Sequence, residues 1–124
     1  MNKYFIQLAQ NLTYIKPDEW QSIPIEVFED YNTETKEDCT EYVIYLKITN
    51  GNEEIASKAM DIEDEYYYDI YYCTDLDKVF VGILGNAGNK EDITEEVSPD
   101  TLKLFKDHIK EFAKQYREVN PFKI

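Results

Sequence analysis

The stretch Glu63-Asp64-Glu65-Tyr66-Tyr67-Tyr68-Asp69-Ile70-Tyr71-Tyr72-Cys73-Thr74-Asp75 decides the fold, because it combines strong strand-forming residues with a regular pattern. Tyrosine and isoleucine favour extended backbone, so residues 66–73 are predicted to form a strand. Successive side chains of a strand point to opposite faces. One face therefore carries Tyr66, Tyr68, Ile70 and Tyr72, and the other carries Tyr67, Asp69, Tyr71 and Cys73. The charge of Asp69 predicts that this second face is the solvent face.

The segments on either side of this strand predict antiparallel neighbours. Residues 74–77 are typical of a turn, and the alternation over residues 79–84 predicts the second strand of a hairpin. Upstream, residues 42–49 alternate as a strand and end at Asn50-Gly51, a dipeptide that suits a two-residue hairpin turn. Residues 53–62 are then expected to return antiparallel, and a short helix over residues 53–60 is the alternative.

Helical spacing marks both ends of the chain. Apolar residues recur every three or four positions over residues 2–15, and Pro17 prevents easy continuation of this helix. Ser98 as N-cap and Pro99 at the first helical position begin a second helix, which spans about residues 99–119 and stops at Pro121. Its apolar stripe is flanked by Lys103, Lys106, Lys110, Lys114 and Arg117. We interpret this basic flank as a solvated helix face.

The remaining segments complete an α+β chain. Residues 23–29 suit an edge strand, residues 32–41 are polar and predict a loop, and residues 85–89 are rich in glycine and asparagine. Residues 91–97 form an acidic approach to the last helix. The expected order is an N-terminal helix, about five mostly antiparallel strands, and a C-terminal helix packed on the sheet. At 124 residues, we expect residues 1–124 to form a single domain.

The charge of the chain restricts its partners. The formal net charge is −13, with −15 in residues 1–97 and +2 in residues 98–124. Such a field repels nucleic-acid backbones and anionic membranes and attracts basic proteins, so we expect neither direct nucleic-acid binding nor membrane binding. The first residues lack the long apolar run of a signal peptide, which predicts a cytoplasmic protein. The sequence leaves the oligomeric state open.

Motifs for catalysis, metals and cofactors are weak. The single histidine, His108, lies inside the last predicted helix without the partners of a catalytic triad. Two cysteines and one histidine, far apart in the sequence, do not form the ligand spacing of a zinc site. The acidic runs lack the frame of an EF-hand loop, and the glycines lack the pattern of a phosphate-binding loop. We therefore expect no enzymatic activity, no metal and no cofactor.

The tyrosine-rich stretch is the candidate binding site. Tyrosines beside carboxylates offer flat amphipathic contact area together with acceptors for lysine and arginine. A strand whose tyrosines simply pack in both layers is the alternative, because tyrosine enrichment is a tendency of interfaces and not a signature. The candidate partner-binding residues are Glu63, Asp64, Glu65, Tyr67, Asp69, Tyr71, Asp75 and Asp77.

A short segment adds a resemblance. Ile15-Lys16-Pro17-Asp18-Glu19-Trp20 follows an amphipathic helix and precedes Ile25-Glu26-Val27-Phe28, and it is similar to the start of one family of bacterial toxin-immunity proteins. The resemblance implies a small acidic inhibitor that binds and neutralises a basic toxin domain, such as a nuclease. Two alternatives stay open. One is a nucleic-acid mimic of the anti-restriction or anti-CRISPR kind, and the other is an enzyme that works with carboxylates alone.

Overall fold

The computed structural model describes residues 2–32, 37–61 and 64–119, and within them the side chains outside positions 30–32, 37–39 and 117–119. In this part of the chain the sheet has five strands. The elements, in chain order, are α1 (Lys3–Thr13), α2 (Pro17–Trp20), β1 (Glu26–Asn32), β2 (Glu37–Lys47), α3 (Asn52–Met60), β3 (Tyr66–Cys73), β4 (Lys78–Gly85), β5 (Lys90–Asp92), the 3-10 turn η1 (Thr94–Glu96) and α4 (Pro99–Val119).

The strands form one antiparallel sheet in the order β1-β2-β3-β4-β5. Each strand pairs with its sequence neighbours, and α3 is inserted between β2 and β3. The predicted strand at residues 66–73 is confirmed at both ends as β3, and its hairpin with β4 is confirmed with the turn at residues 74–77. The α+β class and the antiparallel sheet are therefore as the sequence predicts.

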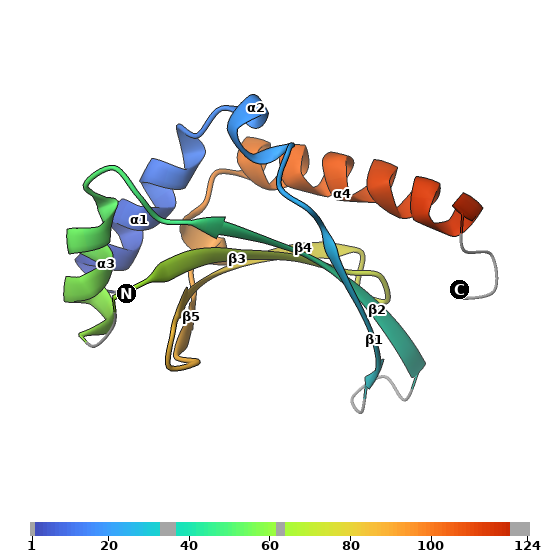
Figure 1. Cartoon of the computed structure of the whole chain (residues 1–124), viewed down its shortest axis with the longest axis horizontal. Coiled ribbons are helices and arrows are strands. Elements are labelled where there is room, and N and C mark those ends of the chain that lie inside the picture. Colours follow the sequence, from blue (N-terminus) through green and yellow to red (C-terminus); the bar gives the residue numbers. More distant parts are fainter. Residues whose placement is uncertain (1, 33–36, 62–63, 120–124) are drawn as a thin grey trace.

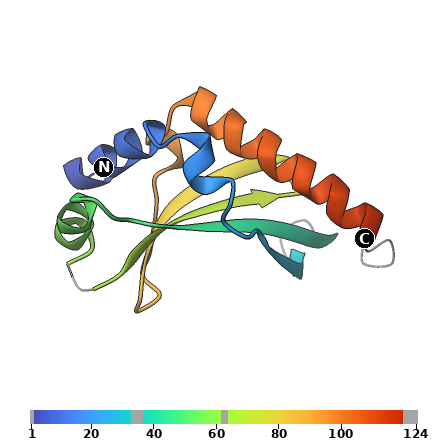
Figure 2. The ribbon, with the colours of Figure 1, turned by 45° about the horizontal axis from the view of Figure 1, so that its top comes forward.

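The helices α1, α2 and α4 cover one face of this sheet (Figures 1 and 2). Helix α4 begins as predicted, because the Ser98 hydroxyl oxygen accepts a hydrogen bond from the Thr101 backbone N–H at 3.2 Å. Trp20 from α2 packs against Phe105 of α4 with ring centroids 4.5 Å apart. The inward row of β3 lies in this core, as predicted; it consists of Tyr66, Tyr68, Ile70 and Tyr72. The predicted stop at Pro121 lies outside the described residues.

The hairpin predicted after Asn50-Gly51 is wrong, and the helical alternative is correct. Both residues have the positive φ angles that such a turn uses, 59° and 86°, but they lead into α3. Ala56 of α3 is fully buried, and the Asn52 side chain is hydrogen-bonded to Asn11 of α1 at 2.5 Å. Two effects explain the helix: the segment lacks strand-like alternation, and the position beside β2 is taken by β3.

Two further expectations are corrected at the edges of the sheet. The polar segment predicted as a loop at residues 32–41 belongs, from Glu37 onward, to β2, which pairs with β1. Hydrophobic alternation is missing there because this end of the hairpin bends away from α4 (Figure 1). The acidic approach at residues 91–97 includes the last two residues of β5 and the whole of η1, where the Thr94 hydroxyl accepts a hydrogen bond from the Val81 N–H at 2.9 Å.

The sheet is arched, with its hollow side turned away from the helices (Figure 1). The β1–β2 hairpin bends away at one end and the β4–β5 hairpin at the other. Because α1, α2 and α4 all lie on the opposite side, the hollow side remains uncovered by described residues. We call this surface the open face. It presents the second row of β3, together with the residues that stand beside that row on the neighbouring strands.

Candidate functional site

Strand register determines which side chains share the open face. Val43 is paired with Tyr71, Tyr45 with Asp69, and Lys47 with Tyr67, so these residues of β2 point the same way as the outer row of β3. The same rule applied to the other strands adds the following residues to the open face: Glu26, Phe28, Glu41, Phe80, Gly82, Leu84, Lys90 and Asp92.

At the centre of the open face is a hollow of about 290 Å³. It is lined by side chains from β1, β2, β3 and β5, and these are Phe28, Glu41, Val43, Tyr45, Asp69, Tyr71 and Lys90. Phe28, at the rim, is 44% exposed, so part of its ring is available to a bound molecule. The hollow therefore combines aromatic rings, two carboxylates and one ammonium group.

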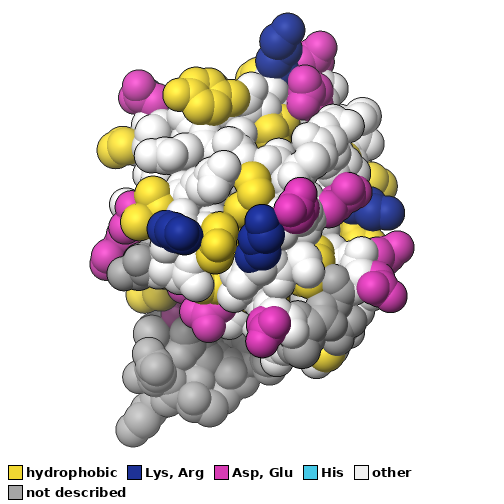
Figure 3. Space-filling view, turned by 90° about the vertical axis from the view of Figure 1, so that its left-hand side faces the viewer, with side chains coloured by type: hydrophobic (Ala, Val, Ile, Leu, Met, Phe, Trp, Pro, Cys, Tyr) yellow, Lys and Arg dark blue, Asp and Glu magenta, His cyan; other side chains and the backbone are white. Residues whose placement is uncertain are grey.

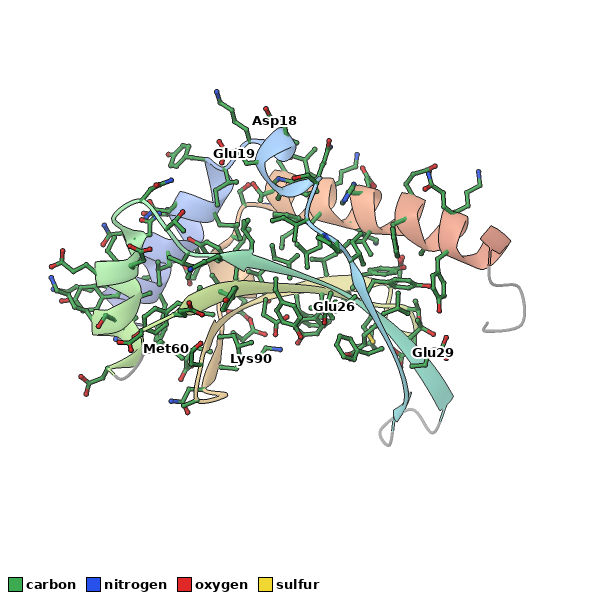
Figure 4. All side chains as sticks on the ribbon, viewed as in Figure 1. Asp18, Glu19, Glu26, Glu29, Met60 and Lys90 are labelled. Atoms are coloured by element: carbon green, nitrogen blue, oxygen red, sulfur yellow. The ribbon has the colours of Figure 1, made fainter. Side chains whose placement is uncertain are left out.

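Asp69 and Lys90 form the electrostatic centre of the hollow. Asp69 is only 6% exposed, and its carboxylate oxygen lies 2.8 Å from the Lys90 Nζ. The same ammonium lies 4.1 Å from the centroid of the Tyr71 ring, a cation–π geometry. Burial alone would lower the pKa of Lys90, but the hydrogen bond and the charge of Asp69 outweigh it and raise that pKa. Figure 4 shows Lys90 on the side of the sheet away from α4.

The tyrosines of the open face are held by their neighbours. Tyr71 stacks on Phe80 with centroids 5.2 Å apart. Burial raises the pKa of Tyr45, and the negative charges of Asp69 and Glu26 raise it further. Burial also raises the pKa of Tyr71, against the opposing effect of the Lys90 charge. Both phenols are therefore neutral near pH 7 and can donate hydrogen bonds to a bound molecule.

The structure places some of the sequence-predicted site residues together on the open face and the others elsewhere. Tyr67, Asp69 and Tyr71 lie together on the open face. Glu65 lies beside them, accepting a hydrogen bond from the Tyr67 hydroxyl at 3.1 Å and facing the Lys47 Nζ at 3.6 Å. The expectation that Asp69 is exposed to solvent is wrong: it lies on the uncovered side of the sheet but is buried under Lys90.

The remaining candidates lie elsewhere. Asp64 is exposed in the segment before β3, Glu63 lies outside the described residues, and Asp75 accepts a hydrogen bond from the Cys73 thiol. Asp77 belongs to the helix side of the hairpin turn, because the Tyr72 hydroxyl donates to it at 2.6 Å and Lys106 of α4 lies 3.1 Å away. These contacts, the Tyr72 hydrogen bond first, lower the pKa of Asp77.

Asp77 also bears on the basic flank of α4. In addition to Lys106, the Lys110 ammonium lies 3.8 Å from the Asp77 carboxylate. Two of the lysines on this flank thus form ion pairs with the turn between β3 and β4. The flank contributes to docking the helix onto the hairpin, beyond the solvated face that the sequence predicts.

His108 has the environment of a packing residue. Its ring meets Trp20 edge to face with centroids 4.8 Å apart, and burial lowers its pKa. Within the described residues, no group of three or more histidine, cysteine or acidic side chains is arranged to hold a metal ion. A search of the same residues found no helix with the length and apolar character needed to cross a membrane.

Comparison with known proteins gives no relative for this chain. No protein-family model, no curated protein and no solved structure matches it. The surface itself is therefore the basis for assigning function. At the end of the molecule that carries α1 and α3, acidic and basic side chains are interspersed with hydrophobic ones (Figure 3). The hollow of the open face differs from this end, because aromatic rings surround an ion pair whose carboxylate is buried.

Sequence reasoning missed several residues of the hollow, notably Phe28, Tyr45 and Lys90. The alternation within residues 42–49 places Val43, Tyr45 and Lys47 opposite the inward row, which was a usable signal for Tyr45. Phe28 and Lys90 gave no such signal. They reach the hollow only through the pairing of β1 with β2 and of β5 with β4, and pairing register is not encoded in a single strand.

Proposed function

We propose that this chain is an inhibitor of the immunity-protein kind, which binds and neutralises a basic protein, such as a nuclease toxin, through the open face of its sheet. The observation that carries the proposal is the set of aromatic side chains on an uncovered sheet face, interspersed with carboxylates. Tyrosine provides a large rigid contact area and hydrogen bonds at low entropic cost, which is why binding surfaces favour it. In a bacterial cell such an inhibitor would act in the cytoplasm.

Net charge supports a basic partner. At −13, the chain attracts a positively charged protein over a long range and accelerates the encounter, while short-range contacts give specificity. A second copy of the chain is a poor occupant of the open face, because two molecules of this charge repel each other. Self-association in solution would count against the proposal.

The arrangement of acids favours this function over the two alternatives. A nucleic-acid mimic needs carboxylates spaced in a strip like phosphates, whereas Glu26 and Glu41 border the rings of Phe28 and Tyr45. A carboxylate-only enzyme needs an acid group available to a substrate. The buried carboxylate of the hollow, Asp69, is instead held at 2.8 Å by Lys90.

The test begins with capture from the host cell. Immobilised protein is incubated with host extract at low and at raised salt, bound proteins are identified, and the basic candidate is purified for titration. We expect Phe28→Ala to weaken its binding about tenfold, because an aromatic contact of the interface is lost. We expect Glu26→Lys to weaken the binding of this protein more strongly at low salt than at high salt, because salt screens the charges. Co-expression with the captured protein should protect cells from its toxicity.

Two variants on the helix side serve as matched controls. Tyr14 is 81% exposed and Glu19 is exposed on α2, so Glu19→Lys repeats the charge reversal and Tyr14→Ala removes a different aromatic ring, both away from the open face. Figure 4 shows Glu19 on the helix side of the sheet and Glu26 on β1. Equal effects of the open-face and control variants, or capture of no basic protein, would refute the proposed function.

A further inference from the structure

The centre of the open face already holds a cation. The Lys90 ammonium contacts the Asp69 carboxylate at 2.8 Å and lies 4.1 Å from the centroid of the Tyr71 ring. A buried carboxylate beside an aromatic face is the environment that binds lysine and arginine side chains. The pair spans three strands, because Asp69 is on β3 and Lys90 reaches it from β5, across β4.

Gly82 makes this reach possible. The backbone of β4 lies between Asp69 and Lys90, and Gly82 is the residue paired with Asp69 on one side and with Asp92 on the other. A Cβ at position 82 would lie 3.0 Å from the Lys90 Cε and 3.4 Å from its Cγ. The aliphatic part of the Lys90 side chain therefore passes directly over Gly82, in space that a larger residue would occupy.

We propose that Asp69 and Tyr71 form a receptor for one lysine or arginine side chain of the basic partner, and that Lys90 occupies this receptor until the partner displaces it. The inference rests on the proposed function and specifies its central contact. In the free protein, Lys90 keeps the buried carboxylate paired, so Asp69 is not left as an isolated buried charge.

Exchange of one cation for another is favoured by the position of Lys90. Its side chain is 39% exposed, whereas the side chain of Asp69 is 9% exposed, so the lysine is the partner that can swing out into water. It comes from β5, a three-residue strand at the edge of the sheet. An incoming guanidinium can bind the carboxylate with two parallel hydrogen bonds and stack on Tyr71, which an ammonium cannot do.

The test uses the peptide acetyl-Gly-Arg-Gly-amide as a probe of the receptor. Lys90→Met keeps the length of the stem and removes the charge, so it empties the receptor. If Lys90 occupies the site for about nine-tenths of the time, the peptide should bind this variant about tenfold more tightly than the wild type. Lys47→Met is the matched control, because Lys47 also lies on the open face but contacts Glu65 instead. It should leave peptide affinity unchanged.

Two further measurements make the result decisive. Asp69→Asn combined with Lys90→Met should lose the gain in affinity, because the buried charge is gone. In the wild type, the Lys90 ammonium NMR signal should move to the position of free lysines as the peptide saturates the protein, a reading that needs no substitution. Equal peptide affinity of wild type and Lys90→Met, with an unmoved ammonium signal, would overturn the inference.

These outcomes are separable from those of the proposed function. One outcome is that a basic protein binds the open face, that Phe28→Ala lowers its affinity and that Lys90→Met does not raise it. This outcome would support the proposed function and refute the receptor. The opposite outcome is that the peptide binds Lys90→Met more tightly but no basic protein partner is captured. This outcome would support the receptor and refute the proposed function.

Discussion

Both sides of β3 are rich in tyrosine, but their surroundings differ. On the covered side, the Tyr68 hydroxyl donates to the backbone carbonyl of Leu8 at 2.8 Å, and the ring is 1% exposed. On the open side, Tyr71 is partly exposed and faces a lysine ammonium. Tyrosine content alone therefore does not distinguish a row that is buried in the core from a row on an uncovered face. The difference arises from what packs above each row.

The comparison also separates stability from binding. Residues on the covered side contact α1, α2 and α4, so their loss should be measured mainly as a lower free energy of unfolding. Phe28, at the rim of the hollow, is 44% exposed, so its loss should mainly reduce the affinity for a partner. The following variants are pairs that test this separation, and they are given from the largest expected effect to the smallest.

The first pair replaces one phenylalanine from each side. Phe105 is 1% exposed and packs on Trp20, whereas Phe28 is 44% exposed. Phe105→Ala should lower the free energy of unfolding by about 3 to 5 kcal/mol, because it leaves a cavity in the core. Phe28→Ala should lower it by less than about 1 kcal/mol. Urea denaturation measures both, and similar losses would contradict the separation of the two sides.

The second prediction concerns the ion pair of the open face. Lys90→Met should lower the free energy of unfolding by about 1 to 2 kcal/mol, because Asp69 is left buried without its cation. The partial exposure of Lys90 keeps this value below that of a fully buried pair. Adding Asp69→Asn should recover part of the loss. A double-mutant cycle in urea measures the coupling, and purely additive effects would show that the two groups do not interact.

The third pair removes one hydroxyl from each side. Tyr68→Phe should cost about 1 kcal/mol, because a buried hydrogen bond to the Leu8 carbonyl is lost. Tyr67→Phe removes an exposed hydrogen bond to Glu65 and should change stability by less than about 0.5 kcal/mol. Thermal unfolding at one pH compares the two. A larger loss for Tyr67→Phe would reverse the assignment of the rows.

The smallest expected effects are on pH dependence, and they differ in sign between the two sides. Burial lowers the pKa of His108 in the folded state, so the unfolded chain binds more protons and stability falls as the pH decreases through 6.5. The pKa of Lys90 is raised, so its contribution persists below about 10.5 and is lost as the pH rises further.

His108→Gln should remove the loss of stability at acidic pH and keep the loss at alkaline pH. Lys90→Met should remove the loss at alkaline pH and keep the loss at acidic pH. Free energies of unfolding between pH 5 and 11 measure both windows. A variant that changed the wrong window would show that another group titrates there.

Prediction from sequence worked best where the signal is local. The ends of β3 follow from alternation, the start of α4 follows from the cap at Ser98, and the inward row of tyrosines follows from the same alternation as β3. Prediction from sequence failed where the conformation of a segment depends on the segments that pack against it. Asn50-Gly51 adopts the φ angles of a hairpin turn, yet α3 follows, because Ala56 is buried in the core while β3 pairs with β2. Part of β2 was missed because it is polar on both faces.

The alternation within residues 66–73 thus determined a strand with two rows of side chains. One row is apolar enough to be buried, and the other contains Asp69. Periodicity is a property of consecutive residues, so the sequence alone could determine it. Only the tertiary structure decided that Asp69 is buried, that Lys90 and Phe28 join it, and that Asp77 belongs to the helix side instead. These facts depend on strand order, register and the placement of helices, which arise from contacts between residues distant in the chain.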